Sequence, residues 1–353
     1  MSKAFSSEVD AGSRQENVSN QESRAPFRFN RNGKGSRRVL LIAAVAILAA
    51  LPLTFGTFWI NMVITALIFS LAVFSINLLT GLTGLLSFGQ AGFVGIGAYT
   101  LGVLAKQGHP PVLAGLYGVL LAMLCGFLLG LPAARLKGHY LAIGTLGFGI
   151  LIYQLLTNSV DVTRGPMGLI GIPTGGIDKQ TWYLIMLSVC LMMLAALAYI
   201  DRCSALGVIL KMVRHDEIAA QASGVNIFAV KLIAFTVSAG FAGLSGALFA
   251  AYVRFLTPDL FNEQESFRYM MMAVVGGIGS PLGGFVASLM LTMIPEGLRV
   301  LGEDNYRLLV YGTMVLFVLW FLPSGIGGLI ERLRKRACSS YPACPSVSAV
   351  CRR

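Results

Sequence analysis

Charged residues are scarce in this sequence. Asp, Glu, Lys and Arg make up 12% of its 353 residues, about half the share of a soluble domain. From Val39 to Ala134 the only charged residue is Lys106. Because a charge at the bilayer centre costs roughly 2.5–3.5 kcal/mol on insertion scales, runs this free of charge are typical of membrane-spanning helices. The composition excludes a large soluble core and predicts an all-α polytopic membrane protein.

The residues that carry catalytic or metal chemistry are also few. The three histidines, His109, His139 and His215, stand far apart, and the cysteines of the tail lack the CxxC spacing of a zinc site. No G-x-x-x-x-G-K-[ST] run occurs, so the chain has no P-loop with which to hydrolyse ATP. We therefore expect a transport subunit rather than an enzyme, with no metal or cofactor bound by this chain.

We interpret the interior of the predicted spans as free of ionisable residues. Carriers driven by a proton or sodium gradient usually keep such residues within the membrane as relays or counter-ions. Their absence disfavours a secondary transporter, although backbone carbonyls at broken helices also bind sodium. A gradient-driven carrier or a channel stays open as an alternative class. The favoured interpretation is a transporter whose energy comes from another protein.

Ten hydrophobic stretches lie between the remaining charged residues, and each is interpreted as one span. They run from Val39 to Phe55, Phe58 to Leu79, Phe88 to Ala105, Val112 to Ala134, Tyr140 to Thr157, Trp182 to Ile200, Ile227 to Tyr252, Tyr269 to Ile278, Phe285 to Val300 and Leu308 to Leu322. Together they predict a permease domain over residues 39–330. Residues 1–38 are expected to be a disordered, basic cytoplasmic extension, and residues 331–353 a basic cytoplasmic tail that contains cysteine.

The distribution of charge predicts the orientation of these spans. The net charge of +11 is concentrated before the first span and after the last, and the positive-inside rule places such clusters in the cytoplasm. Acidic residues such as Asp161, Asp178 and Glu303 fall in the loops expected on the outside. We therefore expect both termini in the cytoplasm, and a lipid bilayer rather than a nucleic acid beside the basic residues.

One polar stretch between two spans, "RHDEIAAQASGVN", begins at Arg214 and predicts a cytoplasmic helix over about residues 213–225. Asp216 and Glu217 suit the first turn of a helix, where the helix dipole favours anions. Ile218, Ala222 and Val225 recur at helical spacing and form one apolar stripe. Gly224 is expected to end or kink the helix. Such a helix either docks into a groove of a partner protein or lies on the lipid surface.

At these residues the sequence resembles a known family. Glu217, Ala219, Ala220 and Gly224 resemble the EAA-type cytoplasmic motif of ABC importer permeases. Four further stretches are similar to the branched-chain amino acid ABC transporter permease family, on the LivM-type side of its paired subunits: "GLTGLLSFGQAGFVGIGAYT", "RLKGHYLAIGTLGFG", "TRGPMGLIGIP" and "VVGGIGSPLGG". The resemblance covers about Val39 to Gly328 and leaves both tails unassigned.

The resemblance implies a type II-like ABC importer permease in a bacterial cytoplasmic (inner) membrane. It implies a second homologous permease subunit, two cytosolic ABC ATPase subunits that use ATP and Mg, and a periplasmic or extracellular solute-binding protein. It favours branched-chain or other hydrophobic amino acids as substrates. The family also includes transporters of urea, short amides and aromatic acids, so these substrates stay open.

Two sets of residues are predicted to carry the transport function. For coupling to the ATPase we expect Arg214, Asp216, Glu217, Ala220 and Gly224. Glu217 would pair with a basic group or helix N-terminus of the ATPase, Ala220 would permit close approach, and Gly224 would set the exit angle. For the solute path we expect Ser87, Gln90, Tyr99 and Thr145, for which hydrogen bonding between helices is the alternative.

Three further segments have candidate roles. The loops from Asp161 to Ile172 and from Asp259 to Glu265 are expected either to receive the binding protein or simply to be solvated. The stretch "GGIGSPLGG" after the short eighth span predicts a discontinuous helix near the path or a re-entrant turn used for packing.

Overall fold

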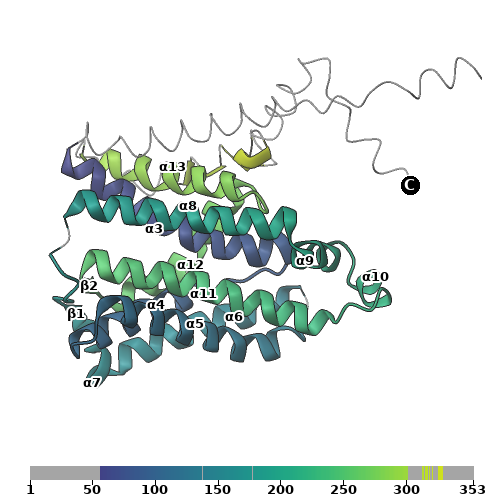
Figure 1. The fold of residues 1–353 in the computed structure, drawn as a ribbon, viewed down its shortest axis with the longest axis horizontal. Coiled ribbons are helices and arrows are strands. Elements are labelled where there is room, and N and C mark those ends of the chain that lie inside the picture. The colour runs from purple at the N-terminus through teal and green to yellow at the C-terminus, as the bar shows by residue number, and fades with distance from the viewer. Residues whose placement is uncertain are drawn as a thin grey trace, which may run out of the picture. The chain divides into compact units, whose positions relative to one another are not determined.

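The computed structural model describes residues 56–136, 138–176 and 178–300, together with residues 312, 313, 315, 316, 318, 320 and 325–328. The predicted first span, most of the tenth, and both terminal segments lie outside the described residues. Element labels follow Figure 1, in which the first labelled helix is α3.

The described part of the chain is almost entirely helical. Its elements in order are α3 (Thr57–Ile76), a π-helix η1 (Asn77–Leu82), α4 (Gln90–Lys106), α5 (Pro111–Ala133), α6 (His139–Asn158), α7 (Val160–Thr163), the 3-10 helix η2 (Gly165–Met167), β1 (Leu169–Ile170), α8 (Lys179–Cys203), α9 (Ala205–His215), α10 (Glu217–Ala222), α11 (Ile227–Val253), β2 (Phe255–Leu256), the 3-10 helix η3 (Pro258–Phe261), α12 (Glu263–Gly276) and α13 (Pro281–Val300).

Five helices of the described part are long and apolar enough to cross a membrane. They cover Phe58–Leu82, Pro111–Ala133, His139–Asn158, Lys179–Asp201 and Ile227–Val253. Each matches a predicted span to within a few residues, because charged or turn-forming residues bound every one of these apolar runs. The 17-residue helix α4 lies on the predicted third span. A total of ten spans stays a prediction.

Helix α11 packs against α5, α4 and α3, and small residues allow the contacts to be close. A side chain added at Gly97 of α4 would meet the backbone of Gly243 in α11, and one added at Gly246 would meet the backbone of Val94. Lipid supplies no hydrophobic drive between helices, so membrane helices rely on such close packing. The glycine-rich runs of the sequence are therefore contact surfaces between helices.

Irregular structure gathers at the two ends of these helices. At one end β1 pairs antiparallel with β2, in the register Leu169 with Leu256 and Ile170 with Phe255, and α7 lies nearby (Figure 1). At the other end of α8, the short helices α9 and α10 lead the chain into α11 (Figure 1). Because α8 and α11 are both candidate spans, α9 and α10 occupy one membrane face and the β1–β2 pair the opposite face.

Two predicted boundaries were wrong. The eighth span was expected at Tyr269, but α12 begins six residues earlier, at Glu263, where the Asn262 side chain accepts a hydrogen bond from the Glu265 backbone N–H at 3.1 Å. The single helix expected at about 213–225 is two helices, because the backbone at Asp216 is extended (φ −156°, ψ 111°). Asp216 therefore ends α9 and caps α10.

Candidate functional site

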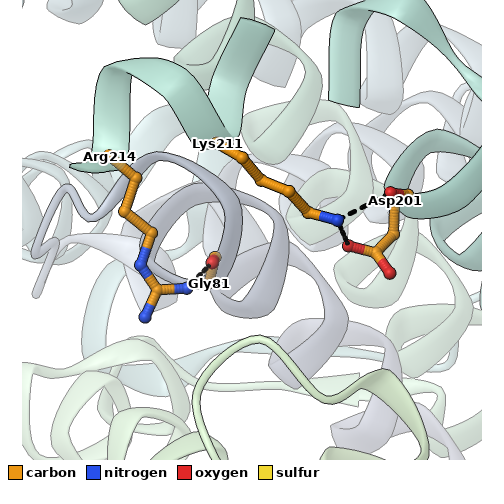
Figure 2. Close-up of polar contacts among 4 residues, drawn as sticks. All are labelled: Gly81, Asp201, Lys211 and Arg214. Carbon is orange, nitrogen blue, oxygen red and sulfur yellow. Dashed lines mark hydrogen bonds and ion pairs between the residues drawn. The ribbon is translucent and has the colours of Figure 1, made fainter. Parts of the chain in front are cut away.

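Helix α9 is held against the end of α8. The Ser204 side chain accepts a hydrogen bond from the Leu206 backbone N–H at 3.2 Å and begins the helix. Lys211 forms an ion pair with the Asp201 carboxylate at 2.7 Å and donates to the Asp201 carbonyl at 2.8 Å (Figure 2). These contacts fix the start of the segment formed by α9 and α10 to a candidate membrane-spanning helix.

Arg214, one of the predicted coupling residues, extends from the last turn of α9 to the π-helix. Its guanidinium donates a hydrogen bond to the Gly81 carbonyl (Figure 2). Gly81 is packed so tightly against Gly279 that an added Cβ would lie 2.8 Å from the Gly279 Cα. The Gly279 backbone N–H donates to the Asn77 side chain at 3.1 Å. Arg214 therefore connects α9 to the π-helix and, through it, to the turn between α12 and α13.

Helix α10 is short, and its geometry is fixed at both ends. The Asp216 carboxylate accepts hydrogen bonds from the backbone N–H groups of Ile218, at 2.8 Å, and Ala219, at 3.2 Å. After the helix, Gly224 has φ +82°, a conformation that a residue with a side chain rarely adopts. Asp216 is an N-cap rather than a first-turn residue, while Gly224 takes the predicted role of ending the helix.

The two faces of α10 differ sharply. Ala220 is buried, with 1% of its surface exposed, whereas Ile218 is 80% exposed. Ala220 therefore packs within this chain, and the predicted close approach to an ATPase would have to use another residue. Ile218 is the large apolar side chain that α10 presents outward.

Glu217 has a partner within the chain. Its carboxylate lies 2.6 Å from the ammonium nitrogen of Lys231, four residues into α11. Lys231 is 2% exposed, so a charge that the sequence reading overlooked is buried within a predicted span. A lysine in an otherwise uncharged span, close in sequence to an acidic helix, was the signal that could have identified this pair.

The four predicted path residues are buried among helices of this chain. Ser87, Gln90, Tyr99 and Thr145 are each 1–3% exposed. Gln90 donates to the Ser238 hydroxyl at 3.1 Å and accepts from Ser75 at 3.3 Å. Thr145 accepts from the Phe88 backbone N–H at 3.1 Å. Their role in a solute path stays a prediction, and the hydrogen bonds support the packing alternative for Gln90 and Thr145.

Ser87 and Tyr99 differ from the other two. Their hydroxyl oxygens are buried and have no hydrogen-bond partner among the described residues. Tyr99 lies more than two turns along α4 from Gln90, with its ring 5.9 Å from the ring of Phe261. The structure thus brings Ser87, Gln90 and Thr145 to the start of α4 and leaves Tyr99 apart.

Helix α6 carries polar side chains on an outward face. Gln154 and Asn158 are exposed although α6 is a candidate span. They lie in an open depression of about 590 Å³, whose other lining residues are Gly147, Ile150, Leu151, Leu155 and Ser159. Both amides lie within the last five residues of α6, and each requires a hydrogen-bond partner or water. This end of the α6 face is therefore more polar than a surface that contacts lipid alone.

Comparison with known proteins agrees with this arrangement. Residues 58–319 match the family model described as "Branched-chain amino acid transport system / permease component". The chain belongs to this permease family. It is therefore a multi-pass membrane subunit of a transport system, and the predicted resemblance to the LivM-type branched-chain amino acid permease family is confirmed.

Several relatives of this permease cover most of its length. The high-affinity branched-chain amino acid transport system permease protein LivM of Escherichia coli (strain K12) is 32% identical over 82% of this chain and 75% of the relative. The autoinducer 2 import system permease protein LsrC of Escherichia coli (strain SMS-3-5 / SECEC) is 25% identical over 82% and 87%. A probable LivM of Methanocaldococcus jannaschii is 21% identical over 59% and 66%. No solved structure matches the permease.

Proposed function

We propose that this permease is the transmembrane subunit of an ATP-driven ABC importer. It forms a translocation path with a second, homologous permease and is driven by two separate cytosolic ATPase subunits that use ATP and Mg. A periplasmic or extracellular binding protein delivers the solute. In this proposal both chain termini lie in the cytoplasm of a bacterial cell, and α9 and α10 face the ATPases.

The observation that carries the proposal is the geometry of α10. A capped helix between two membrane spans presents an 80% exposed isoleucine, Ile218, while its base is tied to α11 through the Glu217–Lys231 pair. A large apolar side chain on a short, fixed helix suits a groove in another protein. Membership of the permease family supports an ATPase as the protein that contains this groove.

The outward face of α6 supports a second permease as a partner. Gln154 and Asn158 lie one turn apart on this face beside Gly147, where an added side chain would meet nothing within 4 Å. Facing a second subunit across a water-filled path, both amides would find partners that lipid does not offer. We place the solute path along the outward face of α6 on this ground. A path along the buried residues Ser87, Gln90, Tyr99 and Thr145, as predicted from the sequence, is retained as the alternative.

The proposed substrates are branched-chain or other hydrophobic amino acids. The name of the 32% identical relative supports this class, while the 25% identical relatives named for autoinducer 2 show how far substrates vary among similar permeases. Urea, short amides and aromatic acids are retained as alternative substrates. On the outer face, the apolar residues Met167 and Ile170, 84% and 63% exposed, are proposed to contact the binding protein.

The source of energy is tested by uptake in the host cell. A strain that lacks this chain and a strain complemented with it are compared for uptake of radiolabelled leucine, valine and urea. Arsenate, which depletes ATP, should abolish the complemented uptake, whereas a protonophore that collapses the ion gradient should leave most of it. The reverse pattern would identify a gradient-driven carrier and overturn the proposal.

A further inference from the structure

Lys231 occupies a position that ordinarily excludes charge. It lies in the second turn of α11, a 27-residue helix whose other 26 residues are uncharged. Its side chain is 2% exposed, so the ammonium group has lost nearly all contact with solvent. A buried charge is tolerated only when it is paired and hydrogen-bonded. The position of Lys231 therefore depends on a partner.

The partner comes from the cytoplasmic helix α10. Within the described part of the chain, Glu217 is the only carboxylate in ion-pair contact with Lys231, at 2.6 Å. The Glu217 side chain is 36% exposed, so the pair joins a buried ammonium group to a carboxylate that solvent can reach. If α10 moved away, Lys231 would lose this counter-ion, which is strongly unfavourable wherever its ammonium group stays out of water.

Helix α11 is suited to pass movement onward. It contacts α3, α4 and α5 along its length, and Gly243 and Gly246 sit at approaches too close for any side chain. Packed interfaces of this kind shift between discrete arrangements rather than deform continuously. A displacement of the Lys231 end of α11 would therefore shift the contacts of α11 with these three neighbouring helices.

We propose that the Glu217–Lys231 ion pair makes α10 and α11 move as one body, so that Glu217 and Lys231 are positioning residues for transport. The inference rests on the proposed function, because it takes α10 to be the helix on which an ATPase acts. It assigns Glu217 to a contact inside the permease, in place of the contact with the ATPase that the motif alone predicted. Contact with the ATPase then falls to Ile218.

A purely structural pair and a transmitting pair are separated by the double variant Glu217→Gln/Lys231→Met. It removes both charges and keeps side chains of similar size, and such paired replacements are often neutral for stability. The full-length variant is expressed in its own host and compared with wild type for amount in the membrane, co-purifying ATPase, ATP hydrolysis and uptake of radiolabelled leucine. Lys106→Met, which removes an exposed lysine at the end of α4, is the control for loss of one positive charge.

The expected result is a variant that reaches the membrane, retains the ATPase and hydrolyses ATP, but takes up leucine roughly 5- to 150-fold more slowly, the usual range of coupling between sites. Uptake within about twofold of wild type would overturn the inference and leave a structural role. If the double variant fails to reach the membrane, the reversed pair Glu217→Lys/Lys231→Glu decides. If the reversed pair takes up leucine faster than each single reversal does, the inference is supported. If the reversed pair is no faster than the single reversals, the inference is overturned.

A failure of the proposed function can be distinguished from a failure of this inference. If no ATPase co-purifies with the wild-type permease from its host, the proposed function and this inference both fall. If an ATPase co-purifies and the neutral double variant transports normally, only the inference falls.

Discussion

The guanidinium of Arg214 donates a hydrogen bond to the carbonyl oxygen of Gly81, which joins helix α9 to the π-helix at the end of a candidate membrane span. π-Helical turns are rare and frequently occur at functional sites. The backbone of Gly81 also abuts Gly279, so the bond lies where three parts of the chain meet. Together with the Glu217–Lys231 pair, it gives the segment formed by α9 and α10 two polar attachments to the long helices.

Replacing Arg214 tests its attachment to Gly81 independently of the Glu217–Lys231 pair. Arg214→Leu removes the donor to Gly81, and we expect leucine uptake to fall several-fold while the protein still reaches the membrane. Arg214→Lys keeps the charge but not the planar donor group, so it should recover only part of the uptake. His215→Ala, at the exposed neighbouring position, serves as the control and should transport normally. Full uptake by Arg214→Leu would remove Arg214 from the coupling residues.

The cap of α10 gives a second prediction. Asp216→Ala leaves two backbone N–H groups without their acceptor, which costs about 0.5–2 kcal/mol for a typical N-cap. Because α10 has six residues, too few to be stable alone, we expect uptake to fall and amide hydrogen exchange to rise over residues 217–222. Asp216→Asn keeps an N-cap acceptor and should stay close to wild type. Equal loss in both variants would point to the charge of Asp216 instead of its cap.

Glycines in different surroundings should respond differently to a methyl group. An added Cβ at Gly246 meets the backbone of Val94, whereas one at Gly147 meets nothing within 4 Å. Overpacking typically costs about 1–3 kcal/mol, so Gly246→Ala should lower the unfolding temperature of the detergent-solubilised permease. Gly147→Ala, at an open position inside α6, should leave it unchanged or raise it slightly, because alanine favours a helix more than glycine does. An unaltered unfolding temperature in Gly246→Ala would show that α4 and α11 do not pack as closely as described.

Replacing Gln90 and Gln154 in turn distinguishes residues that pack helices together from residues that line the solute path. Gln90 is buried and hydrogen-bonded to Ser75 and Ser238, so Gln90→Leu should lower the unfolding temperature because it removes two buried hydrogen bonds between helices. Gln154 is exposed on α6, so Gln154→Leu should preserve that temperature and change the KM or rate of uptake. If Gln90→Leu instead changed KM at constant stability, the inner residues first predicted for the path would be favoured over α6.

Most helix positions could be predicted from hydropathy. The spans from Val112, Tyr140, Trp182 and Ile227 were placed within a few residues of α5, α6, α8 and α11, because Pro, Gly or charged residues bound each apolar run. The start of α12 was missed because Glu263 to Glu265 is polar and was interpreted as part of a loop. Asn262 followed by acidic residues in the first turn is an N-terminal signal that hydropathy alone does not register.

The details of the coupling segment could be predicted only in part. The motif predicted a helix over this stretch, yet it did not show that Asp216 divides it into two helices or that Ala220 faces inward. Lys231 was overlooked because one lysine near the end of a long apolar run hardly changes its average hydropathy. The π-helix at Asn77–Leu82 has no periodic signal of its own. These features depend on contacts between segments distant in sequence, such as Arg214 with Gly81.

The most direct test of the account is the identity of the protein that contacts Ile218. A photoreactive phenylalanine analogue is placed at residue 218 of the full-length chain in its own host, and at Met167 as a control of equal exposure, 84% against 80%, on the opposite membrane face. After irradiation, cross-linked products are purified and identified by mass spectrometry. We predict a P-loop ATPase joined to residue 218 and none joined to residue 167. If cells that still take up leucine yield no ATPase at residue 218, the claim that α10 receives the driving subunit is wrong.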